Sequence, residues 1–265
     1  MPEPSTARKL ACTVALNRPL AAGVQLMRLH CPELAAAIEP GQFFNLAVPG
    51  DPSHLLRLPF SYAHADKEAG EVEFAFRIRG EGTQRLAGLP EGTPTDLLGP
   101  AGIGWRVPAG ARKALLVAGG RGIVTLTALA ESLAEKGIAF DVVQGASIEA
   151  GIAFTDRLSQ FAGGEGRVSV VTEDGSLGTR GLASDVACEL IGRGGYDVVF
   201  ACGPDDMMAR IAAACHEAGV ACQVSMERLM ACGFGACTTC LVDTKHGRKG
   251  ACKEGPVFDA EEVLW

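Results

Sequence analysis

The sequence predicts a multi-domain protein: an antiparallel β-barrel domain, an α/β domain with a parallel sheet, and a small C-terminal domain rich in cysteine. Three observations support this prediction. Short runs of alternating apolar and polar residues fill the first part of the chain, and from about residue 112 apolar strands alternate with helical stretches. From about residue 223 this rhythm stops and three cysteines follow one another closely. Each change of apolar spacing marks a change in the kind of structure.

The first domain is predicted for residues 1–108. Its runs include "QFFNLAVPG", "FSYAHAD" and "EVEFAFRIRG", separated by turn residues. In the last run one face carries Val72, Phe74, Phe76 and Ile78, and the other carries Glu71, Glu73, Arg77 and Arg79. Alternation with a period of two is typical of a β-strand with one buried face, so this region is expected to be antiparallel, a sandwich or a barrel.

The second domain is predicted for residues 109–222. The stretch "KALLVAGG" indicates a buried strand that runs into a glycine-rich turn, and "TLTALAESLAEKG" indicates a helix that ends at Gly137. Further strands are expected at "FDVVQGAS", "RVSVVTEDGS", "YDVVFACGP" and "ACQVSME", with helices around 181–190 and 205–219. Strands that alternate with helices imply a parallel sheet. Residues 223–265 are predicted to form the third domain.

Composition narrows the class of protein. With 265 residues, 48% of them hydrophobic, the chain can build more than one core. A net charge of −7 without an extended basic cluster speaks against nucleic-acid binding. No apolar leader and no run long enough to span a membrane is found, so a cytoplasmic protein is expected. Ten cysteines in such a chain favour metal or redox chemistry over disulfides.

The cysteine segment "MACGFGACTTC" carries the strongest chemical signal. Cys232, Cys237 and Cys240 follow the pattern C-x-x-x-x-C-x-x-C, and Cys252 comes after eleven further residues. This spacing matches the plant-type ligand set of a [2Fe–2S] cluster, so these four cysteines are the predicted metal ligands. The alternative is a four-cysteine zinc site, which usually has two C-x-x-C pairs, whereas this chain has one.

Five segments, taken in order, resemble a known family: "RLPFS", "GEGT", "GPAGIGW", "CGPDDMM" and "SMERLMACGFGACTTC…CKEGPVF". The chain resembles the electron-transfer subunit of class 1B dihydroorotate dehydrogenase, which belongs to the ferredoxin-NADP reductase superfamily. The resemblance covers nearly the whole sequence, and its cysteine segment is the most specific part. It implies that the first domain binds FAD, the second binds NAD and the third binds the [2Fe–2S] cluster.

The resemblance places FAD on two segments of the first domain. The residues concerned are Arg57, Pro59, Phe60, Ser61, Gly80, Gly82 and Thr83. In the superfamily the arginine meets the pyrophosphate, for which a guanidinium fork is suited, and the hydroxyl lies near the flavin ring. Many relatives have a second arginine where this chain has Leu58. At the glycine-rich turn, missing side chains would expose backbone N–H groups to a phosphate. Alternatively, this turn is a plain hairpin turn after the preceding strand.

The resemblance also implies an NAD site at the turn after the first strand of the second domain. Relatives carry Gly-Gly-Gly-x-Gly-x-Ala-Pro, whereas residues 118–125 of this chain read "AGGRGIVT". Gly119, Gly120 and Gly122 remain at the place where a pyrophosphate would meet a helix N-terminus. Arg121 could weaken nucleotide binding or add a phosphate contact, and Thr125 replaces the proline. The alternative is that these glycines serve strand–helix packing alone.

The segment "ACGP" supports the nucleotide interpretation. In the superfamily this strand end lies beside the nicotinamide, so Gly203 and Pro204 are expected at the cofactor and Cys202 next to the transferred hydride, as the candidate catalytic residue.

The three modules together indicate one mechanism. Nicotinamide moves two electrons as a hydride, an iron–sulfur cluster accepts one at a time, and FAD can do both. By resemblance, the partner is an FMN-containing catalytic subunit that oxidises dihydroorotate in pyrimidine biosynthesis, in a heterotetramer with two subunits of each kind. Two alternatives are a related subunit of another complex, of the ferredoxin-NADP oxidoreductase or hydrogenase diaphorase type, and a zinc-stabilised interaction module without enzymatic activity.

Overall fold

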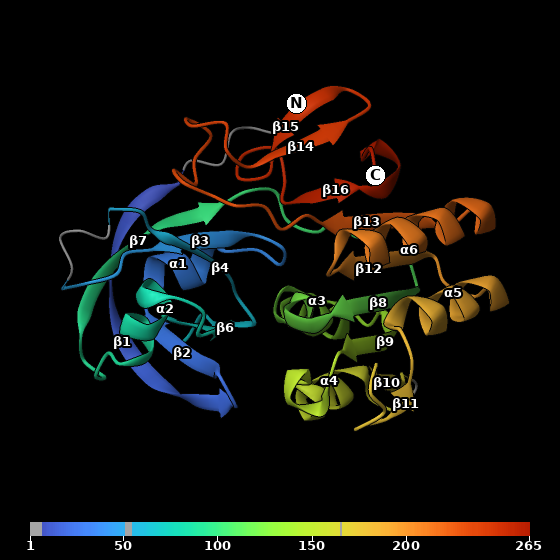
Figure 1. Ribbon diagram of the computed structural model, residues 1–265, viewed down its shortest axis with the longest axis horizontal. Coiled ribbons are helices and arrows are strands. Elements are labelled where there is room, and N and C mark those ends of the chain that lie inside the picture. The colour runs from blue at the N-terminus through green and yellow to red at the C-terminus, as the bar shows by residue number, and fades with distance from the viewer. Residues whose placement is uncertain (1–6, 51–54, 165) are drawn as a thin grey trace.

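The computed structural model describes residues 7–50, 55–164 and 166–265. The first half of the chain forms a seven-stranded sheet with the order β4-β3-β7-β1-β2-β6-β5, in which all neighbours are antiparallel (Figure 1). Its strands are β1 (Arg8–Ala21), β2 (Val24–His30), β3 (Phe43–Leu46), β4 (Leu58–Ser61), β5 (His64–Asp66), β6 (Glu71–Arg77) and β7 (Pro94–Ala101). Two short helices, α1 (Pro32–Ala37) and α2 (Glu81–Ala87), accompany them. The strand β4 contacts β6 as well, so the sheet curves towards the predicted barrel.

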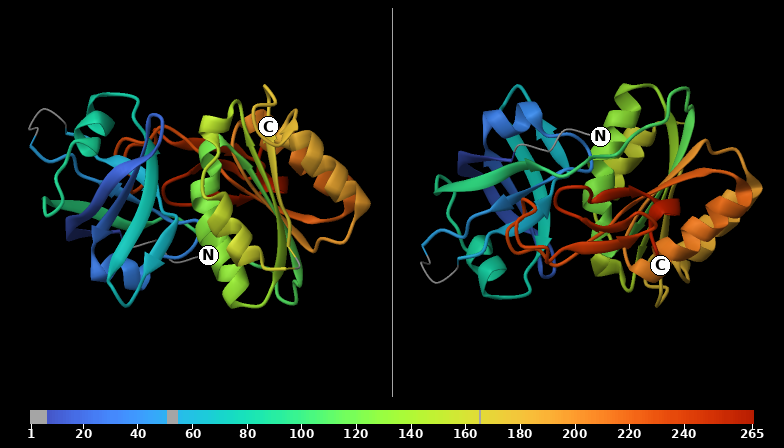
Figure 2. Two further views of the ribbon diagram at one scale, coloured as in Figure 1. Left: turned by 90° about the horizontal axis from the view of Figure 1, so that it is seen from below. Right: turned by 90° about the horizontal axis from the view of Figure 1, so that it is seen from above.

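The second sheet also has seven strands, with the order β11-β10-β9-β8-β12-β13-β16. They are β8 (Lys113–Gly119), β9 (Ala139–Ala146), β10 (Val168–Thr172), β11 (Thr179–Arg180), β12 (Val198–Cys202), β13 (Ala221–Ser225) and β16 (Val257–Asp259). All pairs are parallel except β13 with β16. The helices are α3 (Ile123–Glu135), α4 (Thr155–Ala162), α5 (Ala183–Arg193) and α6 (Asp205–Ala218). Figure 2 shows α3 and α4 on one face of the sheet and α5 and α6 on the other. The predicted parallel α/β architecture is confirmed.

The C-terminal segment is built onto this second sheet. After β13 the chain forms a long loop, then the hairpin β14 (Leu241–Thr244) and β15 (Gly247–Gly250), and returns as β16 beside β13. The predicted boundary between residues 222 and 223 therefore falls inside β13. Because β16 pairs with the edge strand β13, Val242 and Cys252 share one hydrophobic core with Val224. No helix in the described ranges is both long and apolar enough to cross a membrane.

The two faces of the predicted strand 71–79 are both used in the structure, and one of them contacts the second half of the chain. Val72, Phe74 and Phe76 are buried as predicted, whereas Ile78 lies beyond the end of β6 and is 39% exposed. On the opposite face Glu73 is only 2% exposed, because Arg157 of α4 covers it. Burial by itself raises the pKa of Glu73, but hydrogen bonds and charge from Arg157 and Arg28 outweigh it and lower the pKa. This charged face thus joins the two domains.

A second ion pair crosses the same junction, and we expect it to make stability depend on pH. His64 Nδ1 of β5 lies 2.7 Å from Glu131 Oε2 of α3. The hydrogen bond to Glu131 raises the pKa of His64, opposed in part by burial and by Arg157. A raised folded-state pKa means that the stabilisation is complete below the ordinary histidine pKa of about 6.5 and is lost as the pH rises through the raised value.

The measurement compares urea unfolding of the natural chain with that of Glu131→Gln at pH 5.5 and at pH 8.5. Since both side chains are partly exposed, the pair is expected to contribute under about 1 kcal/mol. The difference in unfolding free energy between the two chains should be larger at pH 5.5. An equal difference at both pH values would contradict a charged His64–Glu131 pair.

Candidate functional site

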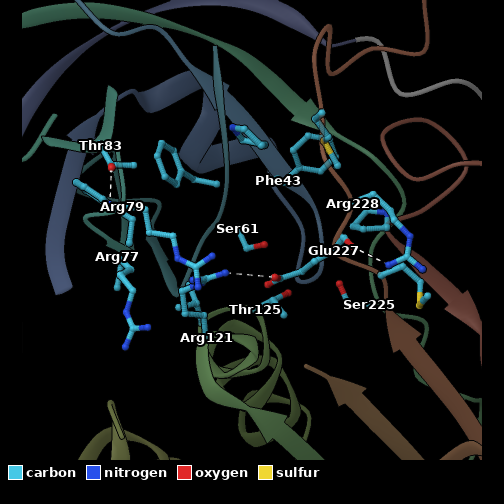
Figure 3. Close-up of a pocket in the computed structure, with 18 residues that line it drawn as sticks. Phe43, Ser61, Arg77, Arg79, Thr83, Arg121, Thr125, Ser225, Glu227 and Arg228 are labelled. Carbon is cyan, nitrogen blue, oxygen red and sulfur yellow. Dashed lines mark hydrogen bonds and ion pairs between the residues drawn. The ribbon is translucent and has the colours of Figure 1, made fainter. Parts of the chain in front are cut away.

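Two open cavities lie along the junction of the two sheets. The first has a volume of about 270 Å³ and is enclosed by β3, β4 and β6 on one side and by α3 and the loop after β13 on the other (Figure 3). The second, of about 840 Å³, lies at the carboxyl ends of β8, β9 and β12. Ligands of open parallel sheets bind outside these strand ends. The lining of both cavities includes Arg77, Arg79, Arg121 and Glu227, so the cavities adjoin.

The first cavity has an aromatic wall. Pro59, Phe60 and Ser61 of β4, for which the sequence predicts contact with FAD, line it together with Phe43 and Phe76. The ring centroids of Phe60 and Phe76 are 5.3 Å apart, which fixes the ring positions by mutual packing. The Ser61 hydroxyl points into the hollow (Figure 3). An apolar wall with a few hydroxyl groups suits a planar heteroaromatic ring such as that of a flavin.

Arg57 lies away from this hollow. Its Nη1 donates to the Asp96 carbonyl oxygen at 3.0 Å, and its guanidinium also pairs with the Asp96 carboxylate. Arg57 is not among the described residues that line either cavity. The contact of Arg57 with a pyrophosphate stays a prediction. To form it, the guanidinium would have to release Asp96.

Arg77 and Arg79, at the end of β6, are the basic residues that the sequence reasoning overlooked. Both line the two cavities. Within the described part of the chain neither guanidinium forms an ion pair or a side-chain hydrogen bond. They were assigned to the charged face of a strand, although their place directly before the glycine turn "GEGT" was a usable signal.

The turn itself begins α2 beside the first cavity. Gly80 is the N-cap residue, Gly82 is buried, and Thr83 lines the cavity. The Thr83 hydroxyl accepts hydrogen bonds from the backbone N–H groups of Arg79 and Gly80, at 2.9 and 3.1 Å, and donates to the Gly80 carbonyl oxygen at 2.9 Å. The Thr83 side chain therefore stabilises the turn. An anion here would have to be bound by backbone N–H groups and not by the Thr83 hydroxyl.

The glycine-rich turn after β8 contacts the β12–α6 turn closely. A Cβ atom on Gly122 would lie 2.0 Å from the Cys202 carbonyl oxygen, and one on Gly119 would lie 2.6 Å from Pro204 Cδ. Gly203 is equally confined, with 2.6 Å to Met207 Cε. The packing interpretation thus explains these three glycines. It also explains why both turns border the second cavity, because the close approach brings them side by side.

Gly120 differs from its neighbours in the turn. Its φ is +55°, in the region that favours glycine, and a Cβ atom there would meet open space. It lies in the short 3-10 turn 120–122 that leads into α3. Backbone at this position can approach a ligand in the second cavity without a side chain in between.

Cys202, the candidate catalytic residue, lies at the end of β12, directly before the cavity-lining Gly203. It is 1% exposed, it is not among the described lining residues, and burial strongly raises its pKa. The thiol is therefore protonated at neutral pH. Its predicted place beside a transferred hydride stays a prediction. Its carbonyl oxygen packs against Gly122 of the neighbouring turn.

Arg121 and Glu227 form an ion pair at the junction of the cavities. Arg121 Nη2 and Glu227 Oε2 are 3.7 Å apart, and Figure 3 shows the two side chains meeting across the opening. Arg228 anchors the same loop, because its guanidinium binds both carboxylate oxygens of Asp205 at 3.1 and 3.0 Å.

The four predicted metal ligands lie in the C-terminal segment as two pairs. Cys232 interacts with Cys237, and Cys240 with Cys252. The Ala236 N–H group donates to Cys232 Sγ at 3.2 Å, and the Cys252 N–H group to Cys240 Sγ at 3.4 Å. Among the described residues no three His, Cys, Asp or Glu side chains are grouped closely enough to hold a metal ion. The thiols share one region but do not form a closed ligand set.

The loop nevertheless has the features that an iron–sulfur cluster requires. Hydrogen bonds from the side chain and the backbone of Thr239, together with those from Cys232, lower the pKa of Cys237 to about 6, which favours the thiolate that binds iron. Gly233 and Gly235 have φ values of +76° and +91°. Such glycines let the chain wrap closely and direct N–H groups at sulfur.

Asn45 of β3 lies directly beneath this loop. A Cβ atom on Gly233 would come within 2.4 Å of its amide oxygen and nitrogen, and Asn45 Nδ2 is buried without a partner among the described residues. An unpaired buried donor under a cysteine loop fits a sulfur-containing group. The sequence signal was an asparagine within the apolar run "QFFNLAV".

Comparison with known proteins gives consistent matches. Residues 227–264 match the model of the iron–sulfur cluster binding domain of dihydroorotate dehydrogenase B. A dihydroorotate dehydrogenase B (NAD(+)) electron transfer subunit from Bacillus caldolyticus is 35% identical over 95% of this chain and 97% of its own length. The subunit of the same name from Bacillus velezensis is 36% identical over 97% and 99%.

Comparison with solved structures gives matches as well. The structure of an NADH-dependent reduced ferredoxin-NADP oxidoreductase has a TM-score of 0.84 and 28% identity, covering 96% of this chain and 90% of the other. A ferredoxin NADP+ reductase from Neisseria gonorrhoeae with bound FAD and NADP has a TM-score of 0.65 at 16% identity, over 80% and 92% of the two chains. The latter likeness concerns the fold.

Proposed function

The chain belongs to the family of dihydroorotate dehydrogenase B electron transfer subunits, and from this premise we propose where its cofactors are held. It is an NAD-linked oxidoreductase subunit that uses FAD, NAD and a [2Fe–2S] cluster. We assign FAD to the first cavity, NAD to the second and the cluster to the cysteine loop. The observation that carries this assignment is that four residues line both cavities, so ligands in the two would meet.

The residues of the first cavity would bind and shield the flavin. When bound, FAD supplies the conversion between two-electron and one-electron chemistry. Phe43, Phe60 and Phe76 provide apolar surface that excludes water from the ring, and Ser61 offers a hydrogen bond to its polar edge. Arg77 and Arg79, without ion-pair partners in the described residues, would bind the pyrophosphate.

The second cavity would hold the nicotinamide nucleotide. Gly120 exposes backbone at the N-terminal end of α3, where the helix dipole favours an anion. Arg121 adds a positive charge at the same turn and can exchange Glu227 for a phosphate. Gly203 and Pro204 form the opposite border. These residues orient the nucleotide towards the first cavity.

Four thiolates, from Cys232, Cys237, Cys240 and Cys252, would bind the cluster. Family membership favours this arrangement over the zinc alternative, because the matched segment is an iron–sulfur cluster binding domain. The cluster serves single-electron exchange with the catalytic partner subunit. We propose that this partner holds FMN, oxidises dihydroorotate and assembles with this chain as two subunits of each kind.

The test of the assignment is a visible absorption spectrum of the anaerobically purified chain, with iron, sulfide and flavin quantified, before and after NADH. One FAD and two iron atoms per chain are expected, and the visible absorption of the flavin and the cluster should bleach when NADH is added. Bound cofactors that do not respond to NADH would contradict the second cavity as a nucleotide site, and a colourless zinc protein would contradict the cluster.

The cysteine loop also presents the surface on which the partner would dock. Leu229 is 86% exposed and Phe234 is 56% exposed, both within the loop that carries Cys232 and Cys237. Aromatic side chains such as that of Phe234 are enriched at the centres of interfaces, and contact there would bring the cluster close to the partner's redox centre.

Phe234→Asp is therefore expected to weaken association with the catalytic subunit at least about tenfold, since loss of a central aromatic anchor typically costs about 2 kcal/mol or more and about 1.4 kcal/mol is tenfold in affinity. Reduction of a dye by NADH should be unchanged, because Phe234 lines neither cavity as described. Association is measured by analytical ultracentrifugation. Leu177→Asp, on the distant β10–β11 loop, is the control. Equal affinity of both variants would contradict docking at the cysteine loop.

A further inference from the structure

Thr125 combines burial with an unused hydroxyl group. It lies in the first turn of α3, is 3% exposed, and its Oγ1 has no hydrogen-bond partner among the described residues. Two residues further on, the Thr127 hydroxyl donates to the Ile123 carbonyl oxygen at 2.8 Å. Thr125 forms no bond of this kind among the described residues. A buried hydroxyl without a partner destabilises the chain on its own.

The hydroxyl of Thr125 is directed into the first cavity. Thr125 lines that cavity and is absent from the described lining of the second. In Figure 3 its oxygen faces the same hollow as those of Ser61 and Ser225, which come from β4 and β13. The three hydroxyl groups thus approach one space from three separate elements.

The groups that line the first cavity indicate which kind of ligand it can bind. One wall is aromatic, as described above, and the hydroxyl of Thr125 can both donate and accept a hydrogen bond. A ligand that satisfies both features is a planar ring with nitrogen and carbonyl oxygen atoms along its edge. The flavin ring assigned to this cavity has this character.

We propose that Thr125 is a flavin-binding residue, whose hydroxyl forms a hydrogen bond with the polar edge of the flavin ring in the first cavity. The inference rests on the proposed assignment of FAD to that cavity. It explains why a buried hydroxyl is left without a partner in the chain: its partner belongs to the ligand.

The test compares Thr125→Val, which keeps the shape and removes the hydroxyl, with Thr125→Ser, which keeps the hydroxyl. The FAD dissociation constant of the full chain is measured by flavin fluorescence without NADH, together with the absorption bands of the bound flavin. Thr125→Val is expected to bind FAD about threefold to tenfold more weakly, with shifted bands, and Thr125→Ser to bind close to the natural affinity.

Thermal unfolding without added FAD separates this role from a structural one. Removing an unsatisfied hydroxyl should leave the Tm of Thr125→Val equal or higher, whereas a hydroxyl that supports the fold would lower it. Natural FAD affinity in Thr125→Val would overturn the inference, as would a raised KM for NADH with FAD binding unchanged, which would assign the hydroxyl to the nicotinamide. A natural chain that binds no FAD would instead contradict the proposed function.

Discussion

Replacing Cys237 with alanine is expected to abolish electron transfer between this chain and its catalytic partner. The loss should be at least about a hundredfold, because even partners outside the ligand set typically cost 10- to 100-fold when they are replaced. Cys237 is the exposed member of the four, and the hydrogen bonds that lower its pKa favour the thiolate form that binds iron. Reduction of a dye by NADH should remain within about twofold, since it needs the two cavities and not the cluster.

The measurement quantifies iron and sulfide per chain and follows dihydroorotate-dependent NAD reduction in the complex with the partner. Cys188→Ala is the matched control, because Cys188 is a partly exposed cysteine on α5, outside the cysteine loop. Loss of both activities together in Cys237→Ala would contradict the separation between cavities and cluster. A full complement of iron in this variant would remove Cys237 from the ligand set.

Gly122→Ala is expected to destabilise the chain by about 3 kcal/mol and to raise the KM for NADH at least about tenfold. The φ of Gly122 is −54°, so alanine meets no backbone strain. The obstacle is the Cys202 carbonyl oxygen, 2.0 Å from the new Cβ, which is backbone and cannot rotate away. One of the two turns must shift, and with it the Gly120–Arg121 border of the second cavity.

Urea unfolding and steady-state kinetics with a dye as acceptor check this expectation. Gly192→Ala is the control: Gly192 lies in α5 with open space at its Cβ position, so alanine there should stabilise by up to about 1 kcal/mol. If Gly122→Ala matched Gly192→Ala in stability and kinetics, the close packing of the two turns would be contradicted.

Much of the fold was predictable because local spacing encodes it. The run at 71–79 predicted β6 through its period of two, and "KALLVAGG" predicted β8 and the turn that follows. The antiparallel and the parallel halves, and the [2Fe–2S] cluster with its family, were predicted correctly. These features depend on residues close together in the chain, so a sequence displays them directly.

What the sequence determined by itself is therefore the kind of each element and the presence of the cysteine pattern. The tertiary structure decided which faces meet: Glu73 is buried by α4, β16 completes the second sheet, and Cys202 lies behind Gly122. It also directed Thr125 into the first cavity and Asn45 under the cysteine loop. Such juxtapositions join residues far apart in the chain. They are set by the packing of whole sheets and helices, which no local period records.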